Sequence, residues 1–181
     1  MKKKLFTILL ACVCCVANAA EFKTKAKSAF LVDYDSGTEI VAKNADTLMP
    51  PSSMIKLMTL AVLFDEIKAG NLTLDDRIPV GPNADYESPE WYPASKICLR
   101  AGQTITVRDL ILGLIVLSGG DASVVVAEKL AGSENAFTEM MTAKARSIGM
   151  DQSTFGNASG LPNPNNLMTS RELATLAQHL I

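Results

Sequence analysis

Histidine and cysteine are scarce in this 181-residue chain, and their scarcity excludes several kinds of catalytic site. A Ser-His-Asp triad would have to use His179, the single histidine, and no Gly-x-Ser-x-Gly turn accompanies it. A zinc site needs several histidine, cysteine or carboxylate ligands, which one histidine does not supply. The sequence therefore implies no metal and no cofactor. We interpret His179 as a surface residue near the end of a helix.

The first 19 residues have the pattern of a secretory signal peptide. Lys2, Lys3 and Lys4 precede an apolar run that ends at Val16, and a small-x-small cleavage site ends at Ala19. The apolar run is shorter than a helix needs to span a bilayer as a permanent anchor. Lipidation of the cysteine at position 12 is the alternative, but the apolar run before it would be unusually short. We predict that residues 1–19 are removed on export.

Removal of this leader takes away most of the cysteine and some of the basic charge. Three of the four cysteines lie in it, so Cys98 is left without an intrachain disulfide partner. We expect Cys98 to be an ordinary, part-buried thiol. Fourteen lysines and arginines then stand against 19 acidic residues, a net charge of −5. An acidic exported chain without a basic cluster is a poor candidate for binding nucleic acid or an anionic membrane.

Residues 20–181 are sufficient for one domain, and they contain no visible repeat or linker. Apolar segments 29–32 and 39–42 flank a turn and predict a β-hairpin. Residues 77–80 could form one more strand. The segment 110–117 is apolar on all sides apart from Gly113, which predicts a helix buried in the middle of the domain. Thr106-Val107-Arg108-Asp109 resembles a capping box at the start of this helix, with Asp in place of Glu. Helical spacing and capping residues predict further helices that begin near residues 53, 121, 134 and 171.

Ser53 is the only serine in the chain with a lysine three residues after it. Pro50 and Pro51 can lead into a helix but cannot lie inside one, so a helix that begins near Ser53 places its hydroxyl and the Lys56 amine on one face. A lysine whose pKa is lowered by burial can take the proton from a serine nucleophile. By itself the spacing is weak evidence, because a helix cap followed by a solvated lysine also satisfies it.

The residues around this pair add specificity. The segment Pro51-Ser52-Ser53-Met54-Ile55-Lys56-Leu57-Met58-Thr59 resembles the active-site segment of the penicillin-binding D-alanyl-D-alanine carboxypeptidases. The resemblance implies a three-layer α/β/α fold of the transpeptidase and β-lactamase type, with a helical part beside an antiparallel sheet. It also extends to the loop Phe155–Pro162 and to the helix after it.

Two further motifs complete the active site of that family, and this chain departs from both. Ser118-Gly119-Gly120-Asp121 aligns with the family's Ser-Gly-Asn-Asp, so Ser118 can relay a proton while Gly120 replaces the substrate-binding asparagine. A literal Ser-x-Asn at Ser133 is interpreted as an ordinary helix start. No Lys-Thr-Gly segment occurs, so we expect residues 20–181 to be the N-terminal part of a catalytic domain with an incomplete sheet. The chain is then either a piece of a longer protein or a decayed copy.

The resemblance implies an exported serine-type D-Ala-D-Ala carboxypeptidase of the periplasm or the outer face of the bacterial inner membrane. Ser53 would be the nucleophile, Lys56 its base, Ser118 the proton relay, and Gly120 would occupy a substrate-binding position. The expected partners are peptidoglycan stem peptides ending in D-Ala-D-Ala and β-lactam inhibitors. The alternative is a catalytically incomplete remnant that binds penicillin or the cell wall, which Gly120 and the absent third motif favour.

Overall fold

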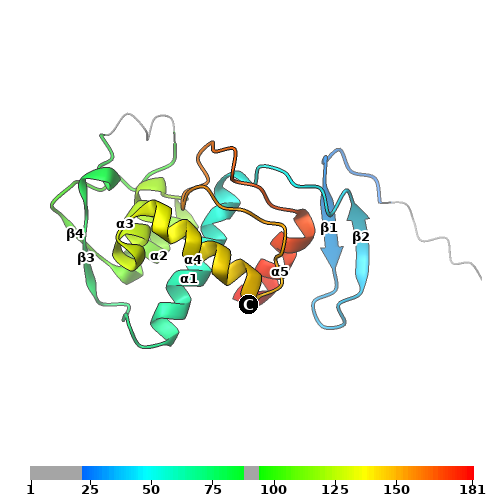
Figure 1. Ribbon diagram of the computed structural model, residues 1–181, viewed down its shortest axis with the longest axis horizontal. Helices are drawn as coiled ribbons and strands as arrows, with labels where there is room; N and C mark the ends of the chain where they lie inside the picture. The colour runs from blue at the N-terminus through cyan, green and yellow to red at the C-terminus, as the bar shows by residue number, and fades with distance from the viewer. Residues whose placement is uncertain (1–21, 88–93) are drawn as a thin grey trace, which may run out of the picture.

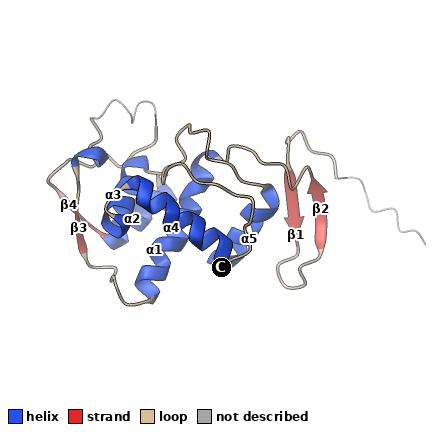
Figure 2. Cartoon of the chain, in the orientation of Figure 1, coloured by secondary structure: helices blue, strands red, loops and turns tan. Residues whose placement is uncertain are grey.

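The computed structural model describes residues 22–87 and 94–181, and their helices gather between two small antiparallel sheets (Figure 1; Figure 2). The predicted signal peptide, residues 1–19, lies outside the described residues. No helix in the described ranges is long and apolar enough to cross a membrane. In chain order the strands and α-helices are β1 Ala29–Val32, β2 Glu39–Lys43, α1 Lys56–Lys68, β3 Arg77–Pro79, β4 Thr104–Thr106, α2 Val107–Val116, α3 Gly120–Ala131, α4 Glu134–Ser147 and α5 Ser170–Leu180.

The predicted hairpin is present at one end of the molecule. Strands β1 and β2 pair antiparallel, with Phe30 opposite Ala42, and α5 packs against β1 (Figure 1). Arg171 of α5 fastens the hairpin: its guanidinium lies 4.5 Å from the centre of the Phe30 ring and forms ion pairs with Asp46 and Glu39. The second sheet, β3 with β4, closes the opposite end of the helical part.

Helix α1 is the centre of the core. Its residues Leu60–Leu63 are all buried, and it contacts α2, α3, α4 and α5. Burying one large apolar side chain contributes about 1.5–3 kcal/mol, so this packing is a main source of stability. Other large side chains that are fully buried include Ile55, Met58, Leu110, Val125, Val126, Phe137, Met141, Met150 and Leu176.

Side-chain caps start three of the helices where the sequence predicts a start. The hydroxyls of Thr106, Ser133 and Thr169 accept hydrogen bonds from the backbone amides of Asp109, Ala136 and Glu172. Each such cap satisfies an amide that the first turn of a helix leaves unpaired. The interpretation of Ser133 as an ordinary helix start is therefore confirmed.

Two expectations about burial are wrong. Helix α2 is not buried on all sides: Leu110, Gly113 and Leu114 face the core, but Leu112 is 51% exposed and Val116 is 71% exposed. Its core-facing side packs against α3 and α1, and the apolar residues on its other side remain exposed. Cys98 is exposed rather than part-buried, and its backbone has a φ of +61°.

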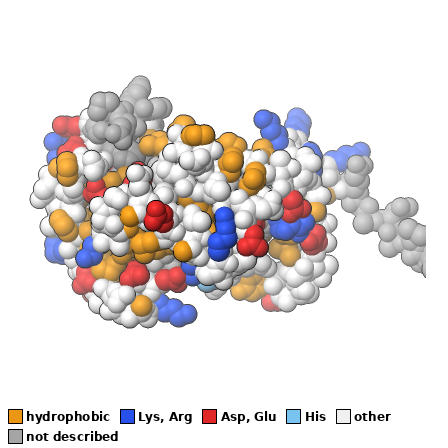
Figure 3. All heavy atoms as spheres, in the orientation of Figure 1, with side chains coloured by type: hydrophobic (Ala, Val, Ile, Leu, Met, Phe, Trp, Pro, Cys, Tyr) orange, Lys and Arg blue, Asp and Glu red, His pale blue; other side chains and the backbone are white. Residues whose placement is uncertain are grey.

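Charged side chains are spread over the surface. On the face shown in Figure 3, acidic and basic residues are intermixed over most of the surface, and a few basic side chains gather at the upper right. His179 is exposed near the end of α5, as predicted.

Candidate active site

The backbone around Ser53 is held from both sides. Residues Ser52–Ile55 form a short 3₁₀ turn that leads directly into α1, so Ser53 lies one turn before Lys56. Ile55 and Pro51 are buried and anchor this turn, whereas Ser53 itself is exposed. Ser52 has a φ of +50°, which an L-residue adopts only at a cost of about 1–2 kcal/mol. Such local strain persists only where the surrounding structure fixes the backbone.

The predicted pair is formed. The ammonium group of Lys56 donates a hydrogen bond to the hydroxyl oxygen of Ser53 at 3.2 Å and one to the carbonyl oxygen of Ser159 at 2.5 Å. Lys56 is only 6% exposed, and this burial lowers its pKa from 10.5 to about 8, although the negative charge of Asp121 opposes the shift. At neutral pH roughly a tenth of the molecules then carry a neutral amine that can accept a proton.

The loop 156–161 approaches the Ser53 backbone closely, and a glycine makes this approach possible. Gly160 has a φ of +78°, and a Cβ atom added there would lie 2.0 Å from the carbonyl oxygen of Ser52. Any side chain would therefore push the loop away from the 3₁₀ turn. Since the carbonyl of Ser159 is an acceptor for Lys56, the same displacement would break the lysine's hydrogen bond.

Asparagine side chains hold this loop in shape. The side-chain carbonyl oxygen of Asn157 accepts hydrogen bonds from the backbone amide of Gly160 and from the side-chain amide of Asn166. The Asn166 side chain also donates to the Leu161 carbonyl and accepts from the Gly156 amide. On the other side, the Glu134 carboxylate at the start of α4 accepts from the amide of Ala158. The position of the Ser159 carbonyl therefore depends on residues distant in the sequence.

The turn between α2 and α3 brings the second motif to the same place. Ser118 has a φ of +55°, and the buried Gly120 donates its amide hydrogen to the carbonyl of Ser95 at 2.8 Å. A cavity of about 120 Å³ lies between this turn, the 3₁₀ turn and the loop 156–161. All four residues predicted from the sequence contribute to its wall. Its lining consists of Ser53, Lys56, Ala94, Ser95, Ser118, Gly120, Ser159, Gly160 and Leu161.

The sequence reasoning assigned no role to three residues of this region. Ser159 acts through a backbone carbonyl, which no side-chain pattern reveals. Gly160 matters because a side chain at this position would collide with the Ser52 backbone. The Gly-Leu pair in a turn-rich loop is the sequence feature that could have pointed to it. Asp121 follows the altered motif directly and is wholly buried, and a charged residue at the start of an apolar helix gives no sign of that burial.

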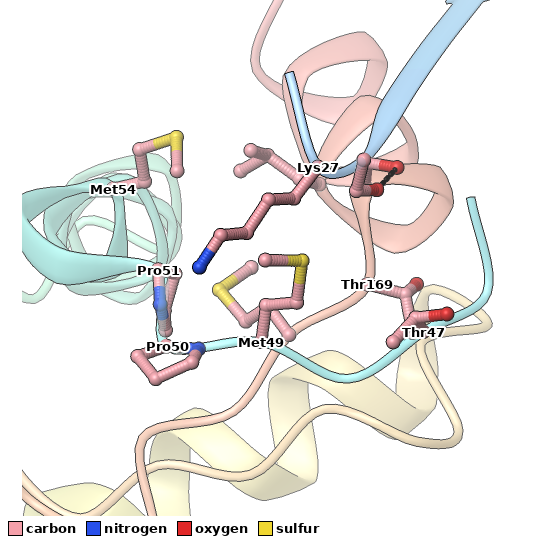
Figure 4. A pocket seen from close by; sticks show the side chains of 11 residues that line it. Lys27, Thr47, Met49, Pro50, Pro51, Met54 and Thr169 are labelled. Carbon is pink, nitrogen blue, oxygen red and sulfur yellow. Dashed lines mark hydrogen bonds between the residues drawn. The ribbon is translucent and has the colours of Figure 1, made fainter. Parts of the chain in front are cut away.

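A larger cavity of about 310 Å³ lies on the other side of Met54, between the start of the hairpin and α5. Five of its eleven lining residues are methionine or proline, and the Lys27 amine reaches over it towards Pro51 (Figure 4). It contains no paired nucleophile and base, so the smaller cavity remains the candidate active site. Within the described ranges, no cluster of three His, Cys, Asp or Glu side chains suited to a metal ion is found.

Comparison with known proteins agrees with this geometry. The family model described as Peptidase_S11, D-alanyl-D-alanine carboxypeptidase, matches residues 15–181. Curated relatives include the D-alanyl-D-alanine carboxypeptidases DacF of Bacillus subtilis (30% identical, covering 91% of this chain and 41% of the relative) and DacC of Escherichia coli (34% identical, 86% and 39%). The chain therefore spans about two-fifths of the length of these relatives.

Solved structures are similar as well. The crystal structure of the D-alanyl-D-alanine carboxypeptidase DacD from Francisella tularensis matches with a TM-score of 0.83 at 33% identity, covering 98% of this chain and 40% of that chain. Penicillin binding protein 6B from Escherichia coli matches with a TM-score of 0.81 at 32% identity, covering 88% and 51%. These matches confirm the predicted transpeptidase-type fold, of which the described residues form the helical part and a portion of the sheet.

Proposed function

This chain belongs to the D-alanyl-D-alanine carboxypeptidase family, and on that premise we propose that it carries the nucleophile half of a serine-type D-Ala-D-Ala carboxypeptidase site. The substrate would be a peptidoglycan stem peptide ending in D-Ala-D-Ala, and β-lactams would acylate the same serine. The leader predicted at residues 1–19 supports export to the periplasm or the outer face of the inner membrane. The observation that carries the proposal is the contact between Ser53 and the buried, partly neutral Lys56.

The chemistry follows from that contact. The Ser53 oxygen attacks the carbonyl carbon of the penultimate D-alanine, and its proton passes to the neutral amine of Lys56. The amide of Ser53, near the start of α1, would stabilise the negative oxygen that forms. When the peptide bond breaks, Ser118 passes its proton to the nitrogen of the departing D-alanine and takes in return the proton that Lys56 received, so Ser118 and the neutral amine are both restored. Water then hydrolyses the ester on Ser53, releasing the shortened peptide and restoring the hydroxyl group.

Gly120 favours a second candidate function, a catalytically incomplete protein that binds penicillin or the cell wall. A glycine offers no side chain to hold the substrate amide or to orient Lys56. The Lys-Thr-Gly segment that would bind the substrate carboxylate is also not among residues 1–181. The second candidate would hold penicillin or the wall peptide without forming an ester on Ser53, so acylation separates the two candidates better than turnover does.

A fluorescent penicillin, followed by peptide mapping, tests the proposal. We expect one adduct, on Ser53, which Ser53→Ala removes and Ser52→Ala retains. Ser52 is a matched control because it is exposed and directly adjacent in the same 3₁₀ turn. An adduct on Ser118 or Ser52 would defeat the assignment. Absence of any adduct from folded protein would favour the binding function instead.

A further inference from the structure

Thr59 is a buried polar residue of α1 that the mechanism above does not use. It follows Lys56 by three residues, so both side chains project from the same face of the helix. Thr59 is 0% exposed, and a hydroxyl buried in the core costs free energy unless it has a hydrogen-bond partner. Its hydroxyl donates to the backbone carbonyl of Ala158 at 2.8 Å, a contact that spans 99 residues of the chain.

The two carbonyls that α1 binds on the loop 156–161 are consecutive. Lys56 donates to the carbonyl of Ser159, and Thr59 donates to the carbonyl of Ala158, the residue before it. One face of α1 therefore binds two neighbouring peptide units of the same loop. Because a peptide unit is planar and nearly rigid, fixing the Ala158 carbonyl limits where the Ser159 carbonyl can lie.

Further hydrogen bonds hold this loop to itself and to α4. Asn157 accepts from the amide of Gly160 inside the loop, and Glu134 of α4 accepts from the amide of Ala158. The buried Ala158 is therefore held by its amide to α4 and by its carbonyl to α1. The Thr59 hydroxyl thus links the loop to the helix that carries Lys56 without involving the lysine itself.

The direction of the Lys56 amine depends on this loop. A lysine side chain has a flexible four-carbon stem, so acceptors must fix the direction of its nitrogen. The Ser159 carbonyl accepts one N–H of Lys56, and the Ser53 hydroxyl oxygen lies 3.2 Å from the same nitrogen. With one N–H bound to Ser159, the lone pair of the neutral amine can face Ser53 and accept its proton. Displacing a reacting group by about 1 Å can reduce a rate by about 100-fold.

We propose that Thr59 is a positioning residue of the active site: by binding the Ala158 carbonyl, its hydroxyl keeps the Ser159 carbonyl against the Lys56 amine. The amine is thereby directed at Ser53. The inference rests on the proposed function in taking Lys56 as the base. The hydrogen bond between Lys56 and Ser159 requires no substrate, so it can also be followed in the free protein.

Penicillin acylation of Ser53 tests the proposal in variants of Thr59. Thr59→Val keeps the shape of the side chain and removes the hydroxyl, so acylation should slow by about 10- to 100-fold. Thr59→Ser keeps the hydroxyl and should label at the wild-type rate, although the loss of a buried methyl group lowers its stability. Thr59→Ala differs from Thr59→Ser only by the oxygen atom and should label as slowly as Thr59→Val. It keeps the test decisive if Thr59→Val does not fold.

Thr142→Val is the matched control. The Thr142 hydroxyl also donates to a backbone carbonyl, that of Thr138 at 2.9 Å, but both residues belong to α4. Its loss should leave the acylation rate unchanged. Equal rates in Thr59→Ser and Thr59→Ala, or a wild-type rate in Thr59→Val, would overturn the proposal, because the rate would then not follow the hydroxyl.

Carbonyl ¹³C NMR of the whole chain provides a measurement that needs no acylation. Lys56→Met removes the donor to Ser159 and should move the carbonyl carbon signal of Ser159. Thr59→Ala should move this signal in the same direction, because the carbonyl leaves the amine, whereas Thr59→Ser should keep it near its wild-type position. A wild-type signal in Thr59→Ala would contradict the proposal. If folded wild-type protein forms no adduct, the proposed function fails, and the Ser159 signal still decides the role of Thr59.

Discussion

Gly160 lies against the backbone of Ser52 so closely that a Cβ atom on it would be 2.0 Å from the Ser52 carbonyl oxygen. This contact sets the distance between the loop carrying Ser159 and the turn carrying Ser53. Because Gly160 has no side chain, the Ser53 hydroxyl and the Ser159 carbonyl can both lie within hydrogen-bond distance of the Lys56 amine.

Gly160→Ala should separate the loop from the turn and abolish acylation of Ser53. The loss would come from steric overlap with Ser52 as well as from the positive φ. Gly149→Ala is the control, because Gly149 has a φ of +82° and open space around it. It should cost only the backbone penalty of about 1–2 kcal/mol in the free energy of unfolding and leave acylation intact. Equal effects of the two substitutions on labelling would refute the close-approach explanation.

Lys56→Ala should lower the rate of penicillin acylation by about 100-fold or more, because Ser53 loses its base. The helix should persist, since alanine is the better helix former. Lys68→Ala removes an exposed lysine from the other end of the same helix and should leave the rate unchanged. Stopped-flow or gel-based labelling measures both, and normal acylation in Lys56→Ala would remove the lysine from the mechanism.

The stability of the chain should increase between pH 8 and pH 10.5 because of Lys56. In that window the unfolded chain binds a proton that the folded chain has released, so the free energy of unfolding rises with pH. The full contribution is about 3 kcal/mol, which is absent below pH 8 and complete above pH 10.5. Urea denaturation at several pH values should show this rise in the wild type and lose it in Lys56→Gln. The same slope in both proteins would mean that Lys56 is not buried as described.

Gly120→Asn should increase the rate of acylation. An asparagine in this wall of the cavity would add a hydrogen bond to the substrate amide and help to orient Lys56. One such contact is worth on the order of 1–3 kcal/mol, or about 5- to 150-fold in rate. Gly132→Asn is the control, because Gly132 ends α3 with a positive φ that asparagine tolerates and has open space around it. An unchanged rate in Gly120→Asn would show that another group already fills this role.

The exposed side of α2 should govern aggregation. Leu112→Glu combined with Val116→Lys places an ion pair of favourable orientation on that side and removes two exposed apolar side chains. Light scattering should show less aggregation, with a free energy of unfolding within about 0.5 kcal/mol of the wild type. The same charges at the buried positions Leu110 and Leu114 have equal spacing on the same helix and should prevent folding. No change in scattering would mean that another surface drives association.

The sequence was sufficient to predict the first hairpin, the helices and the Ser53–Lys56 pair, but strand β4 at Thr104–Thr106 was not predicted. Local residue spacing predicts the hairpin, the helix after Ser53 and the three side-chain caps, because each of them is formed by residues close together in the chain. The Ser53–Lys56 contact follows in the same way, because residues three apart in a helical turn are neighbours. Local rules succeed where the interaction itself is local.

Non-local relationships were not predictable. The Ser159 carbonyl reaches Lys56 across 103 residues, and the Asp121 carboxylate reaches back 22 residues to Leu99. Neither contact can be read from the spacing of residues along the chain. The exposure of Leu112 was not predicted for a similar reason. The sequence of an apolar helix does not show how much of its surface other elements will cover.

Arg171 has a consequence for the order of folding. It joins Asp46 across 125 residues and Glu39 across 132, so the first strands of the described chain are fastened by its last helix. Contacts of such large sequence separation form slowly, because the intervening chain must close first. During synthesis, α1 to α4 can pack while the hairpin still has no docking partner. The hairpin can attach only after α5 has emerged, which makes its docking a late event in the folding of this protein.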